Sequence, residues 1–247
     1  MPDRDFQRAI ELAHRIASEV GTPRFYLEQD REVTLSRDLF ASEPLVAEGL
    51  RIVGRQRECP GHGRLHIEKV AIDLGALILI EEETPAEGVR RRVLLAHLAG
   101  IFHDICRTER DHAERGAREA RRLLAAFSLR DDELDEIAQA IGSHEAFRPE
   151  RAAASPAAQL LADALYDADK FRWGPDNFTD TLWAMVAPLG VRLEALLPKF
   201  LPGLEGIRKI RESFRTPTGR KYGPDFIDRG LAIGQRLYAE LTRDGKK

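Results

Sequence analysis

Cysteine is scarce in this chain of 247 residues, and the scarcity restricts the class of protein. The only two cysteines, Cys59 and Cys106, are too few for the disulfide framework of a small secreted domain. The chain also does not open on a charged segment followed by an apolar one, as a secretory leader would. Together these features predict a cytoplasmic protein.

Long hydrophobic runs are missing as well. The most apolar stretch, residues 71–80, contains Asp73. It is far shorter than the roughly 20 apolar residues that a bilayer-spanning helix needs. We therefore expect no membrane partner.

The chain has no large excess of charge of either sign. Its 38 Lys and Arg residues nearly balance 41 Asp and Glu residues, for a formal net charge of -3. A protein that coats nucleic acid needs a clustered positive excess, so no nucleic-acid partner is expected. The basic segment Arg215–Lys221 is predicted to be a solvated loop, with closure over an anionic ligand as the alternative.

A β-rich block, an internal repeat and a low-complexity tract are all absent. Apolar residues recur instead at helical spacing, which predicts an all-α fold. Residues 24–42 are expected to be mostly irregular. Helices are expected at 6–20, 44–57, from 66 onward, 93–105, from 112 onward, from 131 toward 144, and 157–169, followed by two or three more that are separated by Pro188, Pro198, Pro202 and a loop at 215–224.

What the sequence does contain is a dispersed set of histidines and aspartates on these predicted helices. The adjacent pair His103 and Asp104 ends a nearly uncharged segment, while His66 and Asp169 lie at the margins of amphipathic ones. Imidazole and carboxylate groups both bind first-row divalent metals. If these four residues were unrelated, an aspartate would lie on an apolar helix face without a partner, and burying its charge would cost free energy. The pattern therefore predicts a metal-dependent enzyme.

Two further histidines lie between this pair and Asp169. His112 opens one predicted helix, and His144 follows the buried face of another. With them the count of ligands is enough for a second metal ion. The alternatives are a helix N-terminal residue for His112 and a hydrogen-bonded core histidine for His144.

Three segments and two shorter ones then carry a resemblance to a known family. The segments are Gly-His-Gly-Arg-Leu-His-Ile-Glu-Lys-Val at 61–70, Leu-Ala-Gly-Ile-Phe-His-Asp-Ile at 98–105, Leu-Tyr-Asp-Ala-Asp-Lys at 165–170, His-Ala-Glu-Arg-Gly-Ala at 112–117, and Ile-Gly-Ser-His-Glu at 141–145. Over about residues 62–172 the chain resembles the HD-domain superfamily of metal-dependent phosphohydrolases.

The resemblance implies a division of the chain and a ligand set. It implies an HD-type helical bundle at 61–174, with an N-terminal helical extension at 1–60 and a C-terminal one at 175–247. One metal would be held by His66, His103, Asp104 and Asp169, and a second would share Asp104 and add His112 and His144. The ions would be one or two divalent transition metals (Mn, Fe, Co, Ni or Zn), with Mg as a further option.

The resemblance also assigns Asp104 and Arg107 to catalysis. Asp104 would bridge the ions, and metal-activated water would attack phosphorus. Arg107 stands where some relatives carry a phosphate-binding lysine, and its forked donors suit a phosphate group. The alternative for Arg107 is an ordinary surface arginine.

Two differences from subgroups of this family narrow the range of expected substrates. The run His-Glu-Ala-Phe-Arg-Pro at 144–149 lacks the Gly-Tyr-Pro motif of cyclic-dinucleotide phosphodiesterases. The run Ile-Cys-Arg-Thr-Glu-Arg-Asp at 105–111 lacks the Glu-Asp pair of alarmone hydrolases. Both substrates are disfavoured.

Hydrolysis of a nucleotide or another small phosphorylated metabolite is the leading functional hypothesis. The alternative is a di-iron oxygenase of the same superfamily, which would oxidise a small polar substrate with dioxygen. A regulatory binding module without turnover is a third, and the intact ligand set argues against it. The sequence leaves the oligomeric state open.

Several other residues have a competing interpretation. Asp163 and Asp167 are near-miss alternatives to Asp169. We expect Trp173, Trp183 and Tyr166 to pack in the core. His14, His62 and His97 are expected to serve structure or solvent, with the cleft as an alternative for His62.

Overall fold

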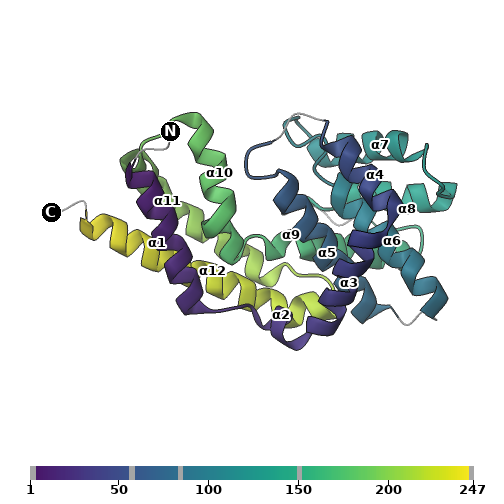
Figure 1. Ribbon diagram of the computed structural model, residues 1–247, viewed down its shortest axis with the longest axis horizontal. Coiled ribbons are helices and arrows are strands. Elements are labelled where there is room, and N and C mark those ends of the chain that lie inside the picture. Colours follow the sequence, from purple (N-terminus) through teal and green to yellow (C-terminus); the bar gives the residue numbers. More distant parts are fainter. Residues whose placement is uncertain (1–3, 56–58, 83–85, 149–151, 245–247) are drawn as a thin grey trace.

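All regular elements that the structure describes are helical, which confirms the all-α prediction (Figure 1). The computed structural model describes residues 4–55, 59–82, 86–148 and 152–244. The elements are α1 (Arg4–Val20), α2 (Arg24–Glu28), α3 (Asp30–Ser42), α4 (Pro44–Val53), α5 (Arg64–Glu81), α6 (Ala86–Phe102), α7 (His112–Leu124), α8 (Asp131–Gly142), α9 (Pro156–Phe171), η1 (Asn177–Thr181), α10 (Leu182–Val186), η2 (Ala187–Leu189), α11 (Leu193–Arg208), η3 (Lys209–Glu212) and α12 (Pro217–Asp244).

The helices form two neighbouring groups in Figure 1. In one, α5 and α6 lie against each other, with α3 and α4 on one side and α8 and α9 on the other. In the other, the long α12 packs against α1 and α11 and also reaches α9 and α5. The first and last helices therefore lie side by side. The domain boundaries inferred from the resemblance stay a prediction.

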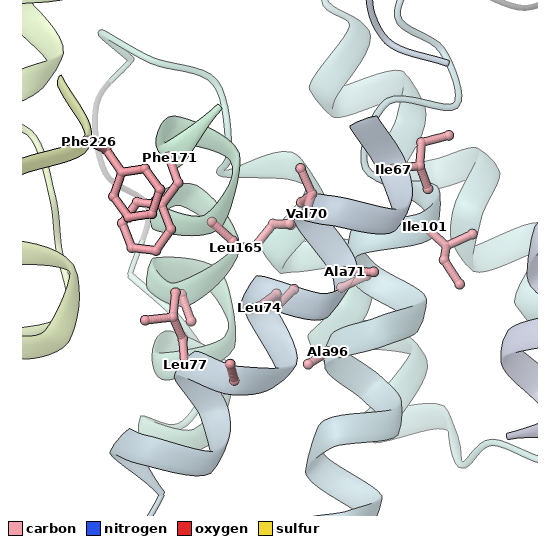
Figure 2. Packing of buried hydrophobic residues seen from close by; sticks show 14 of the residues in the cluster. Ile67, Val70, Ala71, Leu74, Leu77, Ala96, Ile101, Leu165, Phe171 and Phe226 are labelled. Atoms are coloured by element: carbon pink, nitrogen blue, oxygen red, sulfur yellow. The ribbon is translucent and has the colours of Figure 1, made fainter. Parts of the chain in front are cut away.

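Helices α5 and α6 pack closely because glycine replaces a side chain at their contact. A Cβ atom on Gly100 of α6 would lie 2.6 Å from the Cα atom of Ala71 on α5. Figure 2 shows Ala71 and Leu74 of α5 among the apolar side chains of α6 and α9. On the far side of α9, Phe171 stacks on Phe226 of α12, with the ring centroids 4.2 Å apart. This packing fixes the positions of the helix ends that carry the candidate ligands.

The prediction that residues 24–42 are mostly irregular was wrong. They form α2 and α3, and α3 buries Val33, Ser36 and Phe40 against α5 and α6. Asp30 and Glu32 lie in the first turn of α3, where acidic side chains favour a helix. This segment has only a few apolar residues at helical spacing. Such a pattern predicts a helix only weakly as long as the helices that it packs against are unknown.

Two predicted helix limits also need correction. Helix α4 ends at Val53, and residues 56–57 of the predicted 44–57 helix lie outside the described residues. Helix α6 ends at Phe102, so the predicted 93–105 helix is too long. His103 and Asp104 lie in the turn that follows.

Proline was a poor guide to the C-terminal boundaries. Pro198 and Pro202 lie inside α11 instead of separating helices, because its buried face of Leu196, Phe200 and Leu204 holds the helix against its neighbours. The predicted loop at 215–224 is helical from Pro217 onward. Proline suits the first turn of a helix, where its missing N–H has no intrahelical partner.

In the described part of the chain, no helix has both the length and the apolar character that crossing a bilayer requires.

Candidate metal centre

The structure brings five of the six side chains that the sequence nominated as metal ligands into groups whose ligand atoms lie within 4.8 Å of one another, and the sixth, His112, lies beside them with its Nε2 atom 3.9 Å from Oδ1 of Asp104. Five chain segments carry the six residues, and all of the six except His103 line one cavity. They are His66 in the first turn of α5, His103 and Asp104 just after α6, His112 at the start of α7, His144 just after α8, and Asp169 near the end of α9.

One group of ligand atoms surrounds the Oδ2 atom of Asp104. The Nε2 atom of His103 lies 3.3 Å from it and that of His66 lies 3.8 Å from it. The same His66 nitrogen is 3.4 Å from Oδ1 of Asp169 and 3.2 Å from Nε2 of His103. Ligands about 2.1 Å from a tetrahedral metal are roughly 3.4 Å from one another. The spacing is compatible with one divalent metal ion held among these side chains.

The other carboxylate oxygen of Asp104 faces a second pair of histidines. Its Oδ1 atom lies 3.5 Å from Nε2 of His144 and 3.9 Å from Nε2 of His112. The two oxygens of one carboxylate thus face two separate groups of ligand atoms. This arrangement can hold one ion or two.

Backbone carbonyls orient two of the imidazoles. The Nδ1 atom of His103 donates to the carbonyl of Gly100 at 2.8 Å, and Nδ1 of His144 donates to that of Ile141 at 2.6 Å. A carbonyl only accepts, so each Nδ1 carries a proton, and Nε2 is the ring nitrogen that faces Asp104. Metal-binding histidines are typically held by such a bond from the other ring nitrogen.

The protonation pattern also fits a bound cation. Burial opposes ionisation of Asp104, yet the neighbouring His103 holds the pKa of that carboxyl well below its usual range. Burial likewise opposes ionisation of Asp169, whose pKa is held well below its usual range by Lys170 and His66. The Oδ1 atom of Asp104 is nevertheless buried without a hydrogen-bond partner. Two ionised carboxylates and an unpartnered buried oxygen are the environment that a divalent ion satisfies.

His62 is a residue of this site that sequence analysis did not assign to it. We expected it to serve structure or solvent, with the cleft as an alternative, and it lines the cavity. Its ring centroid lies 5.0 Å from that of His66, and its nitrogen is within 4.8 Å of ligand atoms of His66 and Asp104. Burial lowers the pKa of His62 to about 4, so its imidazole is neutral and able to bind a metal. Its place four residues before His66 was the available signal.

Lys170 is a second residue that the sequence analysis did not single out. Its buried ammonium donates to Asp169 and, at 3.1 Å, to the backbone carbonyl of His144. It therefore ties the end of α9 to the segment after α8. Its only signal in the sequence was its place directly after Asp169 in the segment 165–170, one of the segments that resemble the HD-domain superfamily.

The near-miss aspartates are outside the centre. Asp167 accepts hydrogen bonds from the backbone N–H groups of Arg215 and Thr216, each at 2.8 Å, and so anchors the start of α12. Asp163 accepts from Gln159. Arg215 lies over the ring of Tyr166, with its guanidinium carbon 3.7 Å from the centroid, and it donates to the carbonyl of Ser143. The basic segment at 215–221 is therefore held in place.

Arg107 lies at the edge of the ligand cluster. Its Nη1 atom is 2.8 Å from Nε2 of His112, and its Nε atom is 3.9 Å from Oδ2 of Asp104. Because the guanidinium only donates, the lone pair of His112 Nε2 faces it. Arg107 also lines the cavity and keeps about a third of its side chain exposed. A ligand that enters the cavity therefore has access to this cation.

The remaining histidines and aromatic residues lie in other surroundings. His97 is buried 3.0 Å from the hydroxyl of Ser36, away from the centre, and His14 is exposed. Trp183 is buried, as expected, and donates from its indole nitrogen to the carbonyl of Phe178. Trp173, which we expected in the core, is half-buried and lines the cavity.

The cavity itself has a volume of about 590 Å³. The ligand cluster and Arg107 form its polar end, and side chains of η1, α10 and α11 form much of the rest of its wall. A volume of this size accommodates an organic ligand as well as metal ions.

Comparisons of the chain with protein-family models, with curated proteins and with solved structures found no match. The case for a function therefore rests on the residues and geometry of the centre.

Proposed function

We propose that this protein is a metal-dependent phosphohydrolase of the HD-domain type, acting on an ester or anhydride of phosphate. The observation that carries the proposal is the arrangement around Asp104, whose two oxygens face separate groups of imidazole nitrogens at the end of a cavity. A guanidinium, that of Arg107, lies beside the same carboxylate. The resemblance of the motifs to the HD-domain superfamily points the same way.

The ligand atoms suggest how the metals would be held. His66, His103 and Asp169 would bind one ion together with Oδ2 of Asp104, and His112 and His144 would bind another together with Oδ1. When bound, divalent cations supply Lewis acidity, which lowers the pKa of a coordinated water and neutralises phosphoryl oxygens. In the overall reaction, a water oxygen bonds to phosphorus, the P–O bond to the leaving group breaks, and the leaving oxygen takes up a proton.

The protein's own groups bind and orient in this scheme. Arg107 would turn from His112 to a phosphoryl oxygen, since a phosphate is a stronger acceptor than a neutral imidazole. Lys170 holds the carboxylate of Asp169 against the cluster. The carbonyls of Gly100 and Ile141 keep two imidazoles in the tautomer that can bind a metal.

Metal analysis followed by an activity panel tests this proposal. Freshly purified protein would be assayed for bound metal and then for phosphate release from phosphomonoesters, phosphodiesters and nucleotides with Mn, Co, Ni, Mg or Fe added. We expect metal-dependent release from at least one class. Tightly bound di-iron, consumption of dioxygen and no phosphate release would overturn the proposal in favour of the oxygenase.

Variants of the second histidine pair test the number of ions. His112→Ala or His144→Ala should lower the stoichiometry from two ions to about one, because both face only the Oδ1 side of Asp104. His14→Ala is the matched control, since His14 is exposed and is not among the residues that line the cavity. Unchanged stoichiometry in both site variants would indicate a mononuclear centre.

A further inference from the structure

Two sets of elements line the cavity, and they contribute different side chains. The segments from α5 to α9 contribute the histidines and aspartates of the candidate metal centre. The segments η1 and α10 contribute the apolar side chains of Phe178, Leu182 and Met185 to the wall. A metal with a phosphate group needs only the polar set, so the apolar part of the wall is available to another part of the ligand.

Helix α11 contributes a continuous apolar face to this wall. Leu196, Phe200, Leu204 and Ile207 follow one another at intervals of three or four residues, so they share one side of the helix. All four line the cavity and are otherwise buried. Their side chains belong to the hydrophobic core, and the cavity is in effect a gap in that core beside the metal centre.

Phe147 adds an exposed aromatic side chain to the same cavity. It follows His144 by three residues, lines the cavity and is 66% exposed. Its φ angle is 63°, a left-handed conformation that a bulky side chain rarely adopts. Met185 also lines the cavity and is 38% exposed. Large apolar side chains held at the solvent boundary of a cavity are typical of a surface that a ligand covers.

The polar side chains along this part of the wall are few. Asn177 and Thr181 of η1 and the exposed Lys199 of α11 line it. A nucleoside or a sugar brings several hydroxyl groups and ring edges, each of which needs a partner when it leaves water. An alkyl or prenyl group needs none. The wall therefore favours an apolar group over a nucleoside.

We propose that the substrate is a phosphate ester of an apolar alcohol, whose hydrocarbon part lies along Phe178, Leu182 and the Leu196–Ile207 face while its phosphate reaches the metal centre. The phosphate part of this inference rests on the proposed function. The hydrocarbon part rests on the apolar wall of the cavity. It replaces the nucleotide as the first substrate to test.

Two glycines of α11 provide a matched pair of variants. A Cβ atom on Gly203 would meet no protein atom within 4 Å, and Gly203 lines the cavity. A Cβ atom on Gly206 would also meet none, but Gly206 is outside the cavity lining. Leucine favours a helix more than glycine does, so neither Gly203→Leu nor Gly206→Leu should unfold the protein. Only the former adds a side chain where the hydrocarbon is expected.

The experiment measures the binding of methyl-, butyl- and octylphosphonate to the full chain by calorimetry, with and without added Mn. Phosphonates are not hydrolysed as esters, so binding is read without turnover. We expect affinity to rise about two- to fourfold for each methylene that the wall covers. Gly203→Leu should weaken the binding of octylphosphonate at least fivefold and leave methylphosphonate unchanged, while Gly206→Leu should change neither.

The outcomes separate this inference from the proposed function. Affinity that does not depend on chain length, or octylphosphonate binding that Gly203→Leu leaves unaltered, would overturn the apolar-ester proposal even if the protein releases phosphate from other esters. Chain-length dependence with the expected Gly203→Leu effect would support it. If no ester were cleaved, the phosphohydrolase function would be overturned, whereas the chain-length dependence would still show that the apolar wall binds a hydrocarbon group.

Discussion

Two clusters of buried polar side chains each include a residue of α5 and a residue at the C-terminal end of α9 or directly after it, and their pairing differs. In the first, the candidate metal centre, imidazole nitrogens face carboxylate oxygens of Asp104 and Asp169. In the second, Asp73 of α5 accepts from Arg172, which directly follows α9, and from the hydroxyl of Tyr26 at 2.7 Å. The second cluster matches acceptors with donors. In the first, Lys170 donates to Asp169, but Oδ1 of Asp104 has no hydrogen-bond partner.

The charges show the same contrast. Arg172 also pairs with Asp176, and Lys69 donates to Asp176 at 2.8 Å and to Asp180 at 3.3 Å. This Asp73–Arg172 cluster is thus an internal ion-pair network, although the Nε atom of Arg172 is buried without a partner. The metal centre has acceptor atoms that the protein's own groups only partly neutralise. The comparison suggests that an internally paired cluster serves stability, and an acceptor-rich one serves a ligand.

The largest effect on stability is expected from Asp73→Ala. Removing this carboxylate leaves Arg172 with fewer partners in a buried site, which should lower the free energy of unfolding by about 3 to 5 kcal/mol. Urea unfolding of metal-free protein measures the loss. Asp73→Asn is the control, because it keeps an acceptor oxygen for Tyr26 or Arg172 and should lose less. A loss below about 1 kcal/mol would remove the distinction between the two clusters.

Asp104→Ala should have the opposite effect. It should greatly weaken metal binding and change the stability of the metal-free protein only a little. Structural zinc sites bind with roughly 10 to 16 kcal/mol over four ligands, so loss of one ligand should cost about 2.5 to 4 kcal/mol of metal affinity. His103→Ala should be similar but less severe if Asp104 bridges two ions. Metal titration followed by calorimetry, and thermal unfolding of the metal-free variants, check both parts. Full metal content and turnover in both variants would show that the site is wrongly assigned.

Arg107 tests whether a cation next to the ligand cluster acts on the substrate. Arg107→Ala should remove one charge-assisted contact worth about 1.5 to 3 kcal/mol, which is roughly a 10- to 150-fold fall in kcat/KM. Metal content should stay normal. Arg107→Lys should recover only part of the loss, since lysine lacks the forked donors. Unaltered kinetics in Arg107→Ala would return this residue to the role of a surface arginine.

His97 provides a third kind of buried polar group, an imidazole without a carboxylate beside it. Burial lowers its pKa to about 3, whereas Asp104 raises the pKa of His103 despite its burial. Between pH 6.5 and about 3 the unfolded chain binds a proton at His97 that the folded chain does not. Stability should therefore fall with decreasing pH in this range, by about 1.4 kcal/mol per unit from this group.

His97→Gln isolates that contribution. The variant should lose a constant amount of stability at all pH values, and its unfolding free energy should depend less steeply on pH from 6.5 downward. Denaturant unfolding at pH 7, 6 and 5 gives the two slopes. Equal slopes for the variant and the original protein would mean that His97 gains a proton in the folded state as readily as in the unfolded one.

Much of the fold and of the candidate metal centre was predictable because their signals are local. Helical periodicity predicted α5, α7, α8 and α9. Residue type alone predicted the candidate metal ligands His66, His103, Asp104, His112, His144 and Asp169. Helices α2 and α3 were missed, since their few apolar positions gain meaning only against α5. The prolines of α11 misled the prediction, because packing of its buried face outweighs the hydrogen bonds that they remove.

The sequence by itself determined which chemistry the chain offers, because histidine and aspartate keep their metal-binding character in any context. Only the tertiary structure decided that these residues meet, that His62 joins them, and that Asp167 instead anchors the start of α12. It also decided that Leu196 and Phe200 line a cavity beside the centre. In sequence they are ordinary core residues, since an apolar side chain that packs against protein and one that awaits a ligand have the same pattern.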